Sequence, residues 1–124
     1  MRYMMLIYSQ EDQTATVEDR RAVAAAHNSL MEETRRRGIL LAADPLEASL
    51  SATTVRLQND KLLVTDGPYA ETKEQLAGYY ILECQDLDEA LAWAAKIPTA
   101  CAGGVGCIEV RPIREFPRNS LVNE

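Results

Sequence analysis

The sequence predicts an α+β fold in which an antiparallel sheet carries two helices on one face. Strand-like apolar runs and helix-like periodic segments follow one another along 124 residues in the order strand, helix, strands, helix, strand. Two of the runs flank Asn59-Asp60, a pair typical of a tight hairpin turn. This order is that of a ferredoxin-like split βαβ unit with an inserted hairpin. A chain of this length is expected to form a single domain, residues 1–124.

The first strand is predicted at residues 2–8, where apolar and aromatic residues run without interruption. Alternation places Tyr3 and Met5 on one face of this strand and Met4 and Leu6 on the other. Both faces are apolar, so we expect each of them to be buried against another layer of structure. Two helices cover one face of the sheet, and we expect a second subunit to cover the other, which would make the protein a homodimer.

The first helix is predicted at residues 16–37. Thr16 is placed to cap its N-terminus, with Asp19 three residues on in the capping-box position. Gly38 is expected to end it as a left-handed C-cap. The side chains expected to face the sheet recur at helical spacing and include the single histidine of the chain: Val23, Ala26, His27, Leu30 and Thr34.

Four strands are predicted between the two helices, at residues 39–43, 53–58, 61–65 and 79–84. Asp44-Pro45 is expected to stop the first of them. Asp86 is placed to cap the second helix, which Pro98 ends. A last strand is predicted at residues 107–113, after a glycine-bearing connection. The expected apolar face of the second helix comprises Leu87, Ala90, Leu91, Ala94 and Ile97.

Composition excludes several classes of function. The formal net charge of −6, from 13 basic and 19 acidic residues, disfavours binding to nucleic acid. The apolar runs are too short to cross a membrane or to act as a secretion signal. Three cysteines without paired spacing and one histidine argue against a disulfide framework and against a metal site. A cytoplasmic location is expected.

A segment between the hairpin and the following strand links this chain to a known family. The segment runs from Asp66-Gly67-Pro68-Tyr69 through a charged stretch to Gly78. It resembles the signature of the DGPF-domain family, a branch of the YCII-related proteins. The likeness extends from Tyr3 to Pro112. The chain departs from the family pattern in having Tyr69 where the family name implies Phe, and Ala77 where a second glycine is common.

This resemblance implies a fold and a site. Similar proteins adopt the dimeric α+β barrel fold, whose members include small-molecule isomerases, lyases and cofactor-free oxygenases. Members of the family have been proposed to use a histidine paired with an aspartate in a cleft. His27 matches the histidine, and its role there would be general acid or base. Asp66 and Asp44 are the candidates for its partner. The simpler alternatives are a half-buried structural histidine and an Asx-turn carboxylate at Asp66.

Other residues are candidates for ligand binding. Glu109 and Arg111 share one face of the last strand, where polar groups in an apolar pocket would orient a small ligand. Tyr8 and Tyr80 are expected to line the same cavity, or else to be core residues. Lys73, in the charged loop, would dock on a partner subunit or shape the mouth of a cleft, unless it is simply solvated.

Two functions follow from these residues. The first is a small-molecule enzyme or binder with a cleft near His27 and no tightly held cofactor. The second is a non-catalytic accessory or regulatory dimer that uses the signature loop to contact a partner protein. The resemblance also implies a link with extracytoplasmic-function sigma factors and so a stress context. A pocket that contains His27 and a carboxylate would favour the first function.

Overall fold

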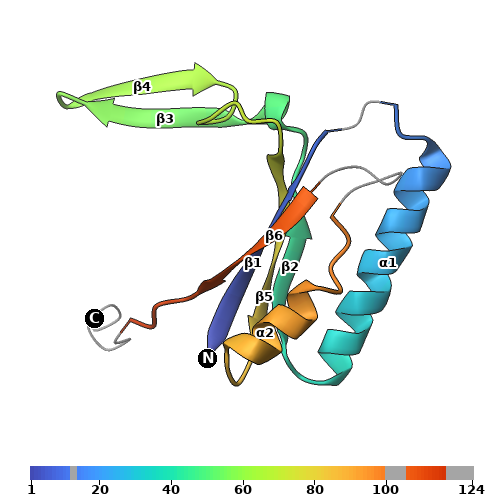
Figure 1. Ribbon diagram of the computed structural model, residues 1–124. Coiled ribbons are helices and arrows are strands. Elements are labelled where there is room, and N and C mark those ends of the chain that lie inside the picture. Colours follow the sequence, from blue (N-terminus) through green and yellow to red (C-terminus); the bar gives the residue numbers. More distant parts are fainter. Residues whose placement is uncertain (12–13, 100–105, 117–124) are drawn as a thin grey trace.

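The computed structural model describes residues 1–11, 14–99 and 106–116 (Figure 1). The order of elements confirms the predicted arrangement of strand, helix, strands, helix, strand. The helices and strands, together with one short 3₁₀ turn, are β1 (Arg2–Ser9), α1 (Val17–Arg36), β2 (Leu40–Pro45), η1 (Ser49–Ser51), β3 (Thr53–Gln58), β4 (Lys61–Asp66), β5 (Gln75–Glu83), α2 (Leu87–Ala94) and β6 (Gly106–Pro112).

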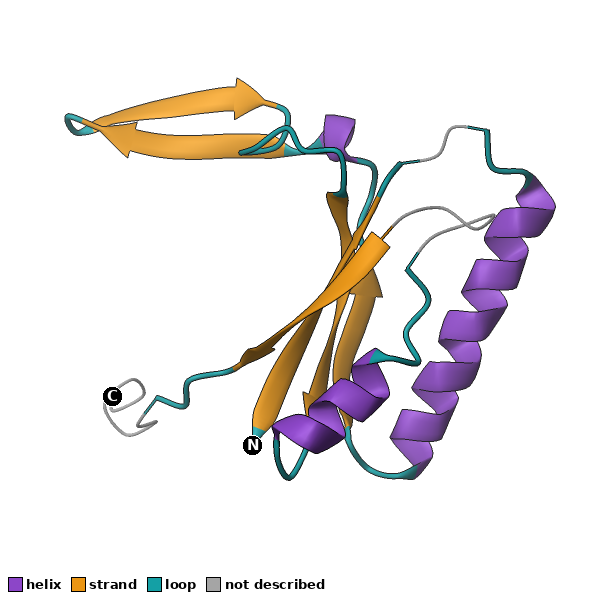
Figure 2. Ribbon diagram, viewed as in Figure 1, coloured by secondary structure: helices purple, strands orange, loops and turns teal. Residues whose placement is uncertain are grey.

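Four of the strands form one antiparallel sheet in the order β2-β5-β1-β6, and β3 and β4 form a separate two-stranded sheet. Both helices lie on the same side of the four-stranded sheet (Figure 2). The chain is therefore a ferredoxin-like α+β domain with a hairpin inserted between β2 and β5. Among the described residues, the other side of the sheet carries no helix, and we call it the helix-free face.

The core lies between the helices and the sheet, with β1 at its centre. Met5 of β1 pairs with Tyr80 of β5 and Val110 of β6, and its side chain is fully buried. The alternation predicted for β1 therefore holds, with Tyr3, Met5 and Ile7 facing the helices. The remaining buried apolar residues are Leu30, Tyr80, Leu82, Cys84, Ala90, Trp93, Ala94 and Ile97.

Two strands extend beyond their predicted bounds by two residues or more. β5 begins at Gln75 rather than residue 79, because its first residues pair with the end of β1 across a bulge between Ile7 and Tyr8. β2 continues through Pro45, which pairs with Gly78. A proline is tolerated there because β2 is an edge strand and one side of it needs no backbone donor.

The ends of α1 are as predicted. The Asp19 amide donates to Thr16 Oγ1 at 3.0 Å, and the Thr16 amide donates to Asp19 Oδ2 at 2.9 Å, which completes the capping box. Gly38 follows the helix with φ +74°, in the left-handed region that favours glycine.

The buried face of α2 differs from the prediction. Asp86 caps the helix by accepting from the Glu89 amide at 2.9 Å, as expected. However, Leu87 and Leu91 are about half exposed, and Trp93 is buried in their place. The indole of Trp93 fills the space above the sheet, and the Lys96 ammonium lies 4.7 Å from its ring centroid.

The β3–β4 hairpin projects from one end of the sheet, toward the side opposite the helices (Figure 1). Asn59 and Asp60 both have positive φ, 51° and 63°, which confirms the predicted tight turn of the primed type. The signature segment closes the base of the hairpin. The Gly67 amide donates to the Ala52 carbonyl at 2.7 Å, and Thr54 Oγ1 donates to the Gly67 carbonyl at 2.8 Å.

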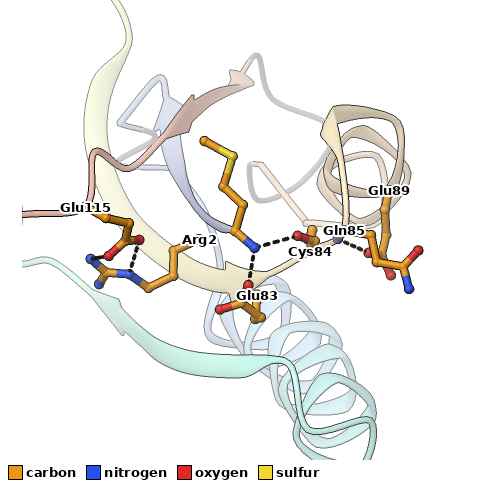
Figure 3. A network of polar contacts seen from close by, with 7 residues as sticks. Arg2, Glu83, Cys84, Gln85, Glu89 and Glu115 are labelled. Atoms are coloured by element: carbon orange, nitrogen blue, oxygen red, sulfur yellow. Dashed lines mark hydrogen bonds and ion pairs between the residues drawn. The ribbon is translucent and has the colours of Figure 1, made fainter.

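Polar contacts join the start of the chain to its later parts at the opposite end of the sheet (Figure 3). The terminal amino group pairs with Glu83 and donates to the Cys84 carbonyl. Arg2 donates to both carboxylate oxygens of Glu115, at 2.9 and 3.1 Å. These contacts hold β1 in register beside the end of β5 and the segment that follows β6.

Candidate functional site

A cavity of about 620 Å³ lies between α1 and the helix-side face of the sheet. α1 contributes Val23, Ala24 and His27, and β5 contributes Gly78 and Tyr80. The end of β2 and residues 46–48 complete the rim. The lining is mainly apolar, and its size is in the range that holds a small organic ligand.

His27 and Tyr80 form the polar centre of this cavity. His27 Nδ1 lies 2.8 Å from the Tyr80 hydroxyl oxygen, within hydrogen-bond distance. The two rings are stacked, with centroids 5.9 Å apart and planes inclined by 27°. Helical spacing on α1 aims His27 at the sheet, and strand alternation on β5 aims Tyr80 at the helix. The second ring nitrogen, Nε2, has no hydrogen-bond partner in the described part of the chain and keeps solvent contact.

Burial keeps both groups uncharged at neutral pH. Burial lowers the pKa of His27 from its usual value, and burial raises the pKa of Tyr80 to about 12. If the Tyr80 hydroxyl donates to Nδ1, Nε2 carries the ring proton and is a donor. If Nδ1 donates to the hydroxyl oxygen, Nε2 holds a lone pair and is an acceptor. The pair can therefore offer either a donor or an acceptor at Nε2 without a change in net charge.

The structure brings Asp44, not Asp66, to the cavity. Asp44 belongs to β2 and lies at the rim, where its Oδ2 accepts from the Tyr79 hydroxyl at 2.7 Å. That hydrogen bond raises the pKa of Tyr79. Asp66 ends β4 in the hairpin and is absent from the cavity lining. The nearest hydrogen-bond partner of His27 is thus a phenol rather than a carboxylate.

The two tyrosines expected to line one cavity lie on opposite faces of the sheet, which corrects the prediction. Tyr80 pairs with Met5 and faces the helices, whereas Tyr8 pairs with Cys107 on the helix-free face. The Tyr8 hydroxyl lies 3.3 Å from Glu109 Oε1. The pKa of Tyr8 is raised, first by desolvation and then by the charge of Glu109.

The other candidate binding residues lie outside the cavity. Arg111 pairs with Met4 and shares the helix-free face with Glu109, as the alternation of the last strand predicted. Lys73 is exposed in the loop before β5 and is also absent from the lining. The candidates therefore divide into His27, Tyr80 and Asp44 at the cavity, three residues on the helix-free face, and two near the hairpin.

Several lining residues had escaped the sequence prediction. Arg20 lies on α1 seven residues before His27, two helical turns away on the same side, and that spacing was the available signal. Asn28 also lines the cavity. Glu11, just after β1, accepts from the Ser49 amide at 2.8 Å and from Ser49 Oγ at 2.7 Å. This double contact holds the η1 segment beside the rim.

Neither a metal site nor a membrane span is found in the described ranges. No group of three or more metal-ligating side chains gathers among residues 1–11, 14–99 and 106–116. Over the same residues, no helix combines the length and the apolar character that crossing a bilayer requires.

The fold and the cavity define a ferredoxin-like α+β protein with a ligand-sized cavity between α1 and the sheet. The chain belongs to the YCII-related family, because the model of the YCII-related domain matches residues 1–117. An uncharacterised protein of Rhizobium meliloti (strain 1021) is 35% identical over 123 residues, which cover 98% of each chain. Neither match bears on a sigma-factor context.

A solved structure also shares the fold. It is 5-chloro-2-hydroxyhydroquinone dehydrochlorinase from Burkholderia phenoliruptrix AC1100, in complex with 2,5-dihydroxybenzoquinone. The superposition has a TM-score of 0.54 and covers 95% of this chain and 98% of that one. At 13% sequence identity the likeness shows the fold alone.

Proposed function

We propose that this protein is a small-molecule enzyme or binder that holds its ligand in the cavity between α1 and the sheet. The observation that carries the proposal is the hydrogen-bonded His27–Tyr80 pair inside a mainly apolar cavity of about 620 Å³. A hydrogen-bonded polar pair in a mainly apolar pocket is an arrangement that orients a small ligand. The dehydrochlorinase that shares the fold supports this choice, because its structure is a complex with a cyclic small molecule.

In the catalytic form of the proposal, His27 is the general base or acid. Its lowered pKa keeps the ring neutral at pH 7, so Nε2 is able to accept a proton from a bound substrate. Tyr80 fixes the ring orientation and, with a pKa of about 12, keeps its own proton. Arg20, at the rim, supplies a positive charge for an anionic substituent. No tightly held cofactor is required by this chemistry.

A panel of small cyclic compounds that includes 2,5-dihydroxybenzoquinone tests the cavity directly. Binding is followed by amide chemical shifts, and the largest shifts are expected for cavity residues such as Ala24 and Gly78. Ala24→Trp fills the cavity from α1 and should abolish binding. Ala22→Trp is the matched control, since Ala22 is exposed on the same helix and is not part of the lining. If both variants bind like the parent, the ligand site lies elsewhere, and the accessory dimer becomes the better hypothesis.

The protein is proposed to act as a homodimer through its helix-free face. Met4, Leu6 and Ile81 lie on this face and are only partly covered. When both faces of a strand carry apolar side chains and helices cover one face, a second layer is needed to cover the other face. A second copy supplies that layer without any other partner.

A further inference from the structure

The inserted hairpin has one apolar face that no other part of the described chain covers. Residues that face each other across an antiparallel pair point to the same side. Val55 faces Val64 and Leu57 faces Leu62, so these four side chains form one face of the hairpin. They are 59%, 60%, 71% and 64% exposed, respectively. We call these four residues the arm face.

The opposite side of the hairpin is mainly polar. Its facing pairs are Thr54 with Thr65, Arg56 with Leu63, and Gln58 with Lys61. Arg56 also lies over the ring of Tyr69, with its guanidinium carbon 5.5 Å from the ring centroid. The hairpin is therefore amphipathic, as a sheet is when one side packs and the other meets water. An isolated two-stranded hairpin is at best marginally stable, so the arm face needs a partner.

The position of the hairpin indicates which partner. It extends from the end of the sheet over the side that lacks helices, so it overhangs the helix-free face (Figure 1). A molecule seated on that face lies within reach of the hairpin. The Gly67 amide bonds the Ala52 carbonyl and Thr54 Oγ1 bonds the Gly67 carbonyl, so the two ends of the hairpin are joined to each other at its base.

The areas favour a second copy that contacts both surfaces. Four strands of six to nine residues, about 3.3 Å per residue and about 4.8 Å apart, make a helix-free face of roughly 500 Å². Stable dimers bury about 800 Å² per partner. The two six-residue strands of the hairpin add roughly 200 Å² by the same spacings. The arm face thus supplies much of the buried area that the helix-free face alone lacks for a stable dimer.

We infer that the β3–β4 hairpin is a dimerisation arm, whose face of Val55, Leu57, Leu62 and Val64 packs against a second copy of this chain. The inference rests on the proposed homodimer and adds a second contact to it. The two arms of a symmetric dimer would each reach across to the other subunit. The signature segment then has a structural role, because Gly67 closes the base of the arm.

The test compares two variants that differ in which side of the hairpin they charge. Leu57→Glu/Leu62→Lys places a facing pair of opposite charges on the arm face and preserves cross-strand attraction. Gln58→Glu creates the same kind of pair with Lys61 on the polar side. Both sites are exposed, so both variants should fold. Sedimentation measures the dimer dissociation constant, and hydrogen exchange measures the protection of hairpin amides.

The arm is supported if the double variant weakens dimerisation at least about tenfold, because two buried leucines are lost, while Gln58→Glu leaves it unchanged. Hairpin amides should also lose protection as the dimer is diluted. If the double variant dimerises like the parent, the arm inference is overturned and the sheet-face dimer stands. If the parent chain is a monomer at every concentration, the proposed dimer and the arm both fail.

Discussion

His27 Nδ1 and the Tyr80 hydroxyl oxygen lie 2.8 Å apart, and they connect the first helix to the sheet inside the mainly apolar cavity between them. The contact joins residues 53 positions apart in the sequence. Both partners are uncharged at neutral pH, because burial shifts their pKa values in opposite directions. Because the pair is neutral, protonation of His27 alone changes the net charge of the site.

Acid should destabilise the protein through His27. Its pKa is lowered in the folded state, so the unfolded chain binds the proton more readily. The contribution of neutral His27 to the free energy of unfolding should therefore be fully present above about pH 6.5. It should fall as pH decreases toward the folded-state pKa. Urea titrations across that range measure the slope. His27→Gln should flatten it. The single histidine also gives one NMR titration curve, and a midpoint above about 6.5 would contradict the burial argument.

Removal of the Tyr80 hydroxyl should cost stability. Tyr80→Phe leaves Nδ1 of the half-buried His27 without its partner, and the expected loss is about 0.5–1.5 kcal/mol. Tyr69→Phe is the control, because Tyr69 is 78% exposed and should change stability by less than about 0.5 kcal/mol. Equal unfolding midpoints for the two variants would mean that the hydrogen bond contributes nothing.

Gly67→Val should be more damaging than Lys73→Ala. Gly67 has φ +101°, which a β-branched residue adopts at a cost of about 1–3 kcal/mol. An added Cβ would meet no atom within 4 Å, so the cost comes from the backbone and not from a clash. Lys73 is exposed and should be nearly neutral. Thermal melts of the two variants decide the question, and coincident curves would refute the turn assignment.

The protein should sediment as a dimer at micromolar concentration, with twice the chain mass of 13.8 kDa. Leu6→Arg should shift it to monomer, because it places a charge at the centre of the helix-free face. Leu6 faces Glu109 across β1 and β6, so the new cation has a partner in the isolated protomer and folding should survive. Ala22→Arg, on the exposed side of α1, is the control. A parent chain that sediments with the mass of one chain would refute the dimer.

Much of the fold was predictable because its signals are local. Each of these signals is encoded by residues only a few positions apart. They are the capping box of Thr16 and Asp19, the cap at Asp86 and the turn at Asn59. The start of β5 was missed because Gln75 and Gly78 have weak strand propensity, and only pairing with β1 and β2 makes them strand.

The site was less predictable because it depends on register between distant strands. Alternation along β5 fixes which residues share a face with Tyr80, but not which face meets the helices. That choice is set by the pairing of Tyr80 with Met5, 75 positions earlier in the chain. The buried Trp93 was missed for a related reason. Spacing along α2 allows two overlapping apolar stripes, and the position of the sheet selects the one that contains Trp93.

The central place of β1 has a consequence for synthesis. Its neighbours in the sheet are β5 and β6. Arg2 pairs with Glu83 and Tyr3 pairs with Pro112, so each ladder can form only after its later strand has been synthesised. At about 5–20 residues per second, the first strand leaves the ribosome roughly 5–20 s before its last partner is made. Until β5 has been made, β1 is an apolar segment with no strand to pair with. The sheet can therefore be completed only after β6 has been synthesised, and contacts this distant in sequence make its folding slow.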